Sequence, residues 1–122
     1  MLPSHPSFIL TITCLVLVGL FGCTYEVAGP CDTGMNVSYA GEILPLLGDH
    51  CSVPGCHVGA FPSAGLDLSS DSAVAESAND GKLLERLQLP GVDPKSMPPS
   101  GPLTECDVLL FETWVNEGAQ IN

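Results

Sequence analysis

Hydrophobic and polar positions divide the chain into an apolar N-terminal segment and a longer region of mixed character. Residues 8 to 22 are almost entirely apolar and carry no charge. From residue 39 onward, apolar residues recur in short groups at helical spacing, and stretches rich in Gly, Pro, Ser and Asp separate these groups. No segment shows the alternation of a strand ladder. The pattern predicts an all-α domain.

Two helices and a less regular segment are expected in the first part of this domain. Residues 39–50 predict a short helix in which Pro45 lies in or near the first turn, because proline lacks a backbone N–H. The Gly48-Asp49 pair predicts a loosening of the helix just before Cys51. Residues 70–79 predict only one or two helical turns. A further helix is expected to begin at Asp80 as its N-cap and to stop before a proline-rich loop, residues 90–102.

The clearest helix begins after Thr104. The Thr104 side chain suits an N-cap, and Asp107 falls at the third helical position. Gly118 ends the segment. An apolar stripe at helical spacing runs between these limits and consists of Val108, Phe111, Trp114 and Val115. This stripe predicts a helix that packs on the core.

The apolar N-terminal segment has the length of a signal-peptide core and is short for a membrane span. It ends in "LFGC", which resembles the bacterial lipoprotein box, where the cysteine is lipidated and becomes the new N-terminus. We expect a signal peptide over residues 1–22, a tether over 23–38 that is lipidated at Cys23, and the domain over 39–122. Thr24 after the cysteine favours the outer membrane, with the domain facing the periplasm or the cell exterior. Simple secretion with cleavage nearby, or an uncleaved anchor, is the alternative.

The charge of the chain narrows the classes of partner. Three basic and 14 acidic residues give a formal net charge of −11. Such a surface repels nucleic acid and anionic headgroups, so membrane attachment must be covalent or hydrophobic, as a lipid anchor provides. A protein partner is expected to be basic at its docking face.

The sequence "CSVPGCH" holds the candidate chemistry of the domain. Covalent haem attachment requires two thiols for the vinyl groups and an adjacent histidine that ligates iron, usually as C-x-x-C-H. Cys56 and His57 supply the adjacent pair, and Cys51 supplies the second thiol across a longer spacing. Pro54 and Gly55 are suited to folding that longer loop back. A small disulfide loop beside an unrelated histidine is the alternative.

A second axial ligand must approach the opposite face of a haem. Met97 is the best candidate because it lies in the proline-rich loop, an irregular segment that can pass over the ring. Met97 as a filler of the core is the alternative. Met35 and His50 compete, but Met35 lies in the expected tether and His50 adjoins Cys51 on the near face.

The order of several short motifs resembles the small cytochrome c-like domains of planctomycete type. These motifs are "EILPLLGDHCSVPGCH", "GLDLSS", "SMPPSGPLT" and "WVNEGA", and they span roughly residues 39 to 122. The resemblance implies a small monohaem cytochrome c-like fold, with Cys51 and Cys56 as thioether positions, His57 as proximal ligand and Met97 as distal ligand. It also implies that the N- and C-terminal helices of the domain pack together, the latter through Trp114. The wider cysteine spacing and a short, Ala/Ser-rich middle depart from the family pattern.

Two cysteines remain after these assignments. Cys14 leaves with the signal peptide, and an exported domain can pair Cys31 with Cys106. The alternative is a buried free thiol at Cys106 and an unpaired Cys31.

These residues suggest three possible functions. The leading expectation is an electron carrier with one covalent haem c and a redox partner protein, not an enzyme. The second is a haem-free lipoprotein module in which Cys51 and Cys56 form a disulfide and the domain acts in protein interactions. A zinc site made of Cys51, Cys56, His57 and His50 is disfavoured, because neighbouring ligands strain a tetrahedral site and the oxidising envelope removes free thiolates.

Overall fold

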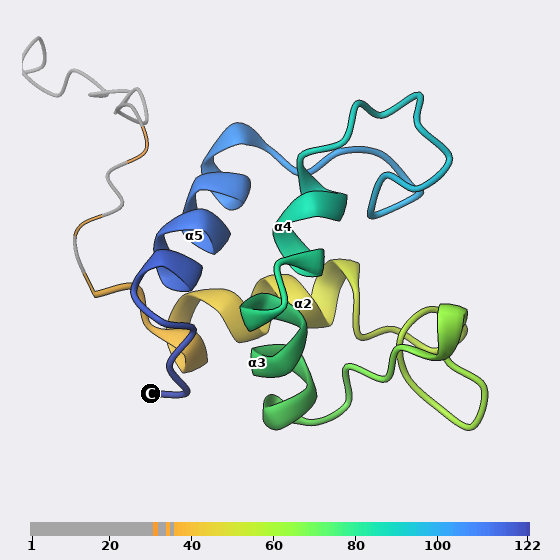
Figure 1. Ribbon diagram of the computed structural model, residues 1–122, viewed down its shortest axis with the longest axis horizontal. Coiled ribbons are helices and arrows are strands. Elements are labelled where there is room, and N and C mark those ends of the chain that lie inside the picture. Colours follow the sequence, from red (N-terminus) through yellow and green to blue (C-terminus); the bar gives the residue numbers. More distant parts are fainter. Residues whose placement is uncertain (1–30, 32–33, 35) are drawn as a thin grey trace, which may run out of the picture. The chain divides into compact units, whose positions relative to one another are not determined.

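The computed structural model describes Cys31, Gly34 and residues 36–122 (Figure 1). The expected signal peptide, Cys23 and Met35 lie outside these residues. The elements are, in order, the π-helix η2 (Tyr39–Ile43), α2 (Leu44–His50), the 3-10 helix η3 (Ser63–Gly65), α3 (Asp71–Asn79), α4 (Lys82–Leu87) and α5 (Glu105–Asn116). Over the described part of the chain, β-type pairing is limited to an isolated bridge between Pro54 and Val58. The expected helical class is therefore confirmed. None of the described helices is both long and apolar enough to cross a membrane.

The first two elements form one helical run towards Cys51. Leu44 donates its backbone N–H to the carbonyl of Tyr39, five residues earlier, and Pro45 follows in the first turn of α2. Proline lacks an N–H, so the start of α2 is a position where it is tolerated, as the sequence predicts. The predicted loosening at Gly48-Asp49 is wrong, because α2 continues through both residues. The N–H groups of Cys51 and Ser52 both bond to the carbonyl of Leu47, at 2.9 and 2.6 Å, and close the end of α2.

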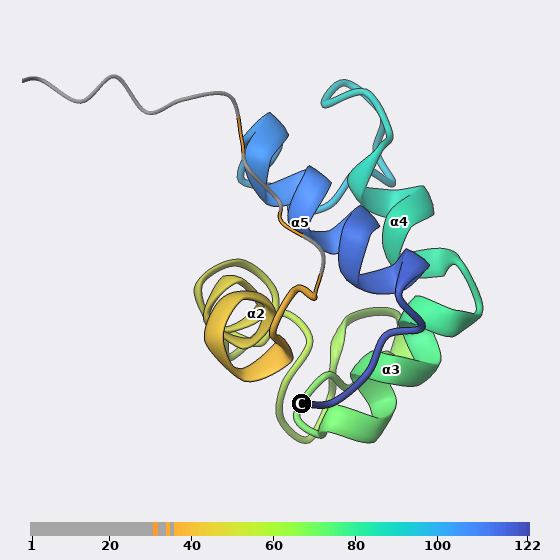
Figure 2. The ribbon, with the colours of Figure 1, turned by 90° about the vertical axis from the view of Figure 1, so that its left-hand side faces the viewer.

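Helix α5 packs against η2, so the two ends of the domain meet (Figure 2). The rings of Tyr39 and Trp114 lie 5.6 Å apart between centroids, and both side chains are buried. The Trp114 indole N–H donates to the carbonyl of Gln120 at 2.8 Å. The carboxyl-terminal Asn122 accepts from the N–H groups of Tyr39 and Ala40. The packing of the first and last helices that the resemblance implied is present at this junction.

Packed structure begins before Tyr39, the expected start of the domain. Val37 is only 2% exposed and belongs to the core. The N–H groups of Asn36 and Val37 donate to the carboxylate of Glu117, at 2.6 and 2.9 Å. The expected tether is therefore docked onto the domain at residues 36–38.

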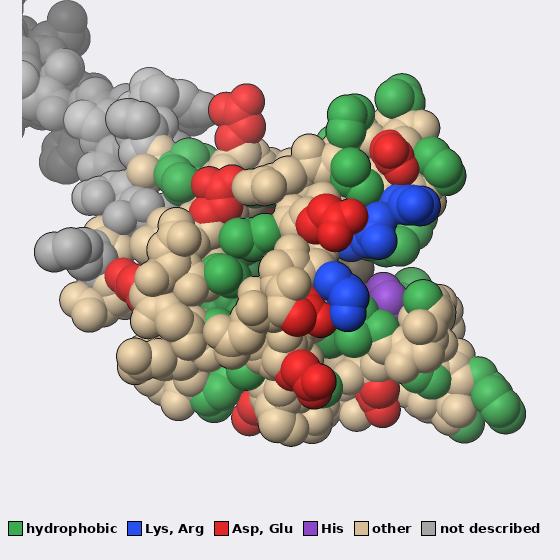
Figure 3. All heavy atoms as spheres, in the orientation of Figure 1, with side chains coloured by type: hydrophobic (Ala, Val, Ile, Leu, Met, Phe, Trp, Pro, Cys, Tyr) green, Lys and Arg blue, Asp and Glu red, His purple; other side chains and the backbone are tan. Residues whose placement is uncertain are grey.

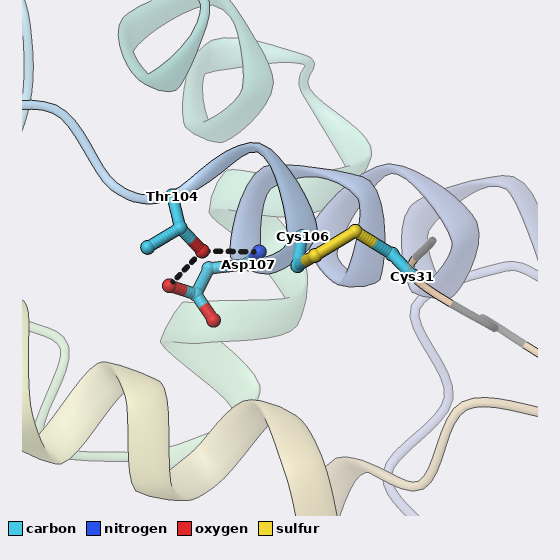
Figure 4. Close-up of a disulfide and its surroundings, with 4 residues drawn as sticks. All are labelled: Cys31, Thr104, Cys106 and Asp107. Carbon is cyan, nitrogen blue, oxygen red and sulfur yellow. Dashed lines mark hydrogen bonds between the residues drawn. A yellow bond between two sulfur atoms is a disulfide. The ribbon is translucent and has the colours of Figure 1, made fainter. Parts of the chain in front are cut away.

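A disulfide joins Cys31 to Cys106 in the first turn of α5 (Figure 4). The two Cα atoms lie 5.3 Å apart, and 75 positions separate the cysteines in the sequence. The expected pairing is therefore present. Thr104 caps the same turn, accepting from the N–H of Asp107 and donating to its carboxylate at 2.7 Å. Thr104 as the N-cap and Asp107 as the third residue of the helix both agree with the sequence prediction.

Helices α3 and α4 contact each other and complete the core. Helix α3 is longer than the one or two turns expected, because Ser70 caps it and Val74 and Ala78 bury one face. The N-cap of α4 is Gly81 rather than Asp80. Gly81 has a φ of 78°, which glycine adopts without strain, and the Asp80 carboxylate accepts from the N–H of Lys82 at 2.9 Å.

Candidate functional site

A cavity of about 400 Å³ lies between the cysteine–histidine motif, α4 and the proline-rich loop. We call it the main cavity. Its volume falls in the range of roughly 300–1,000 Å³ that is usual for cofactor sites. Most of its lining is apolar and includes Leu66, Leu68, Leu83 and Leu87. Cys51, His57 and Met97 also line it, so three of the four predicted haem residues face one cavity.

A smaller space of about 70 Å³, the side hollow, shares these three residues and adds Cys56. His50, Ser63, Pro98 and Pro99 complete its lining. The two spaces together therefore bring all four predicted residues to one place. Figure 1 shows the two loops that contribute them, residues 51–70 and 90–102, on the same side of the helices.

The loop between the two cysteines is folded tightly in spite of its length. The Cys56 N–H donates to the carbonyl of Val53 at 3.0 Å, and Gly55 has a φ of 85°. This is the arrangement of a turn with Pro at its second position and Gly at its third. The N–H of His57 then reaches back to the carbonyl of Cys51 at 3.3 Å. The Pro-Gly turn predicted from the sequence thus returns the chain towards Cys51.

One ring nitrogen of His57 already has a partner. Its Nδ1 lies 3.1 Å from the backbone carbonyl of Leu66. A carbonyl oxygen only accepts, so Nδ1 is the donor in this contact, and in the neutral imidazole the lone pair is then on Nε2. Histidines that ligate metals almost always donate their other N–H in this way. The contact thus orients the ring of His57 as ligation through Nε2 requires.

Met97 is held at the cavity by its backbone. Its N–H donates to the carbonyl of Arg86 at the end of α4, at 3.1 Å. The neighbouring Ser96 is buried, and its hydroxyl donates to the carbonyl of Leu89 at 3.2 Å. These bonds attach the proline-rich loop to the chain around α4 and bring Met97 to both cavity spaces.

The two motif cysteines are free thiols and differ in their surroundings. Cys51 is buried, while Cys56 is partly exposed. Burial first, and the nearby Cys56 second, raise the pKa of the Cys51 thiol to about 11. The structure shows these two cysteines as separate thiols rather than as the disulfide loop of the haem-free alternative.

Two alternatives to the predicted haem ligands were His50 as an axial ligand and a zinc site. His50 is exposed at the end of α2 but lines the side hollow, so the structure does not separate it from the site. Among the described residues, which include all four of the disfavoured zinc site, no three His, Cys, Asp or Glu side chains are grouped so that they could hold a metal ion.

Sequence reasoning missed the Leu66 carbonyl, because a backbone acceptor nine positions away leaves no signal in residue type. The "GLDLSS" motif, which contains Leu66, is the indication in the sequence that this segment belongs with the site. Comparison of the chain with protein-family models, with curated proteins and with solved structures finds no match. The functional argument therefore depends on the residues and their geometry.

Proposed function

We propose that the protein is a one-electron carrier with a single covalently attached haem c. Cys51 and Cys56 form the thioether bonds, His57 is the proximal ligand and Met97 is the distal ligand. The observation on which this proposal depends is the arrangement around His57. Its Nδ1 is bonded to the Leu66 carbonyl, and its ring shares two cavity spaces with Cys51 and Met97.

The residues present fit the chemistry of the group. Two thiols are free to react, one imidazole nitrogen is available, and a thioether lines the same cavity. The mainly apolar lining suits a large planar ring. When bound, the haem supplies reversible one-electron chemistry, and a histidine–methionine ligand pair in a buried site favours a raised reduction potential.

A carrier is favoured over an enzyme because both axial positions have a protein ligand in this proposal. No coordination position is then left for a substrate. The resemblance to planctomycete-type cytochrome c-like domains supports the same small monohaem fold. In this proposal the helical domain is held around the haem by the contact of η2 with α5.

The proposed carrier is anchored in the bacterial envelope through a lipid on Cys23. The lipoprotein-like sequence "LFGC" and the signal-peptide-like segment before it support this anchor. The net charge of −11 favours a redox partner that is basic at its docking face, with faster encounter at low salt.

A haem stain on a denaturing gel tests the proposal. The full chain is expressed in bacteria that carry a c-type haem maturation system, and the expected result is a red protein whose stain survives denaturation. The Cys51→Ala, Cys56→Ala double variant should lose the stain. A colourless wild-type chain would overturn the carrier and favour the haem-free interaction module, with which the Cys31–Cys106 disulfide is also compatible.

The distal ligand has its own test. The Met97→Ala variant should lose the sulfur-to-iron charge-transfer band in the red and show a lower reduction potential. Met35→Ala is the matched control, since Met35 is the competing methionine. Loss of the band in Met35→Ala, with Met97→Ala unchanged, would reverse the assignment.

A further inference from the structure

The charged residues of the chain are distributed unevenly around the main cavity. The chain has only three basic residues, Lys82, Arg86 and Lys95, against 14 acidic ones. Lys82 and Arg86 both line the cavity, whereas no Asp or Glu within the described residues does so. Figure 3 shows basic side chains and a histidine around a hollow on this face of the molecule. A strongly acidic chain thus has a cavity with a cationic lining.

The cavity lining changes along α4. Lys82 and Arg86 are four positions apart, so they lie on one face of the helix. Leu83 and Leu87 are one position further along in each case, are buried, and line the same cavity. The helix therefore gives the cavity an apolar part and a cationic part.

Arg86 is the better placed of the two cations. Its side chain is 34% exposed, compared with 68% for Lys82. The Lys82 ammonium has a close partner in Asp80 at 2.7 Å, whereas Arg86 lies 3.5 Å from the mostly exposed carboxylate of Glu85. A guanidinium has five N–H donors in a planar fork, so a single contact at 3.5 Å leaves most of them available.

We propose that Arg86, assisted by Lys82, binds carboxylate groups on the ligand of the main cavity. The ligand class is a largely apolar molecule with an anionic edge, which an apolar lining beside a planar cation recognises. This inference rests on the proposed function: if the ligand is haem, the carboxylates that Arg86 binds are the haem propionates. The carbonyl of Arg86 also accepts from the N–H of Met97, so the anion-binding residue and the proposed axial ligand are fixed to each other.

Redox titration of the haem-loaded full chain tests the inference. In Arg86→Gln, loss of the cation leaves the propionate charge uncompensated, which favours the ferric form, so the midpoint potential should fall. The propionate pKa should rise for the same reason, and the pH-dependent part of the potential should move to higher pH. The potential and its pH dependence are readouts that a merely structural role of Arg86 would not shift together in these directions.

Lys95→Gln is the matched control, because it removes the same charge from an exposed residue that does not line the cavity. Its potential and pH dependence should stay at the wild-type values. Equal shifts in both variants would mean a general effect of net charge and would overturn the inference. Unchanged values in Arg86→Gln would overturn it as well.

A chain that is purified without haem would contradict the proposed function but would still test the binding of anions. The probes are then 8-anilinonaphthalene-1-sulfonate, which is apolar and anionic, and the uncharged N-phenyl-1-naphthylamine. Arg86→Gln should weaken binding of the sulfonate roughly tenfold, the loss expected for a hydrogen bond to a charged group. Binding of the uncharged probe should not change, and Lys95→Gln should bind both probes like wild type. Equal binding of the sulfonate by wild type and Arg86→Gln, or no binding by wild type, would overturn the inference.

Discussion

The imidazole Nδ1 of His57 lies 3.1 Å from the backbone carbonyl of Leu66, and this contact leaves Nε2 as the ring nitrogen that can face a ligand. The carbonyl belongs to the segment that follows the motif, and a second bond supports the same pairing. The N–H of Leu68 donates to the carbonyl of His57 at 2.7 Å. The segment at Leu66–Leu68 therefore holds both the ring and the backbone of His57 at the main cavity.

His57→Ala should change the haem spectrum without removing the haem. The thioether bonds do not involve the imidazole, so the stain on a denaturing gel should persist in part. Loss of one axial ligand should convert the low-spin spectrum to a high-spin one. Absorption spectroscopy of the oxidised and reduced protein measures this change.

His50→Ala is the matched control, since His50 lines the side hollow together with His57. It should keep the low-spin spectrum. A high-spin spectrum in His50→Ala, with a normal one in His57→Ala, would identify His50 as the ligand.

Removal of the disulfide should destabilise the domain. A cross-link between Cys31 and Cys106 closes a long loop and limits the unfolded chain, so the Cys31→Ser, Cys106→Ser variant should lose about 2–4 kcal/mol of unfolding free energy. Urea unfolding, followed by tryptophan fluorescence, measures the loss. The reduced wild-type protein should match the variant, and a variant as stable as the oxidised wild type would show that the cross-link is energetically neutral.

Phe111 and Leu109 provide a matched pair of substitutions on α5. Phe111 is fully buried, so Phe111→Ala leaves a cavity in the core and should lower the unfolding free energy by about 3–5 kcal/mol. Leu109 is 37% exposed, so Leu109→Ala should lower it by less than about 1 kcal/mol. Urea unfolding of both variants checks the difference, and similar losses would contradict the packing of α5.

Tyr39 should make stability fall at high pH. Burial first, and its hydrogen bond to Asp71 second, raise the pKa of Tyr39 from 10.0 to about 12. The folded state keeps the phenol proton where the unfolded state has lost it. The stabilisation is therefore complete below pH 10 and is lost as the pH rises through about 12.

Tyr39→Phe removes this titration and the 2.8 Å bond to Asp71. It should lower the unfolding free energy near neutral pH by about 1–2 kcal/mol. Between pH 10 and 12 its stability should decline less steeply than that of wild type. Urea unfolding at several pH values measures both effects, and parallel declines would refute the role of Tyr39.

The sequence predicted best the features that depend on neighbouring residues. Thr104 and Asp107 predicted the start of α5, and Pro54 and Gly55 predicted the turn inside the motif, because caps and tight turns are set by local backbone geometry. Asp80 was predicted as the N-cap of α4, one residue before the true N-cap, Gly81. The prediction was close because the Asp80 carboxylate accepts from the N–H of Lys82, the first residue of the helix.

Features that depend on distant contacts were missed. Val37 lies in the segment expected to be a tether, yet its side chain belongs to the core and its N–H donates to the carboxylate of Glu117, 80 positions away. Lys82 and Arg86 have the spacing of an ordinary solvated helix face, so nothing local indicates that they line a cavity. The surroundings of Val37, Lys82 and Arg86 are determined by tertiary packing, which the local sequence does not reveal.

The most direct test of the haem site is the mass of the proteolytic peptide that contains residues 51–57, taken from the full chain expressed with c-type haem maturation. Proteolysis and alkylation are performed under denaturing conditions. The account predicts that the peptide carries one covalent haem, with neither Cys51 nor Cys56 alkylated, whereas the same peptide from the double alanine variant carries none. A wild-type peptide in which both thiols are alkylated, or in which they form a disulfide, would contradict it.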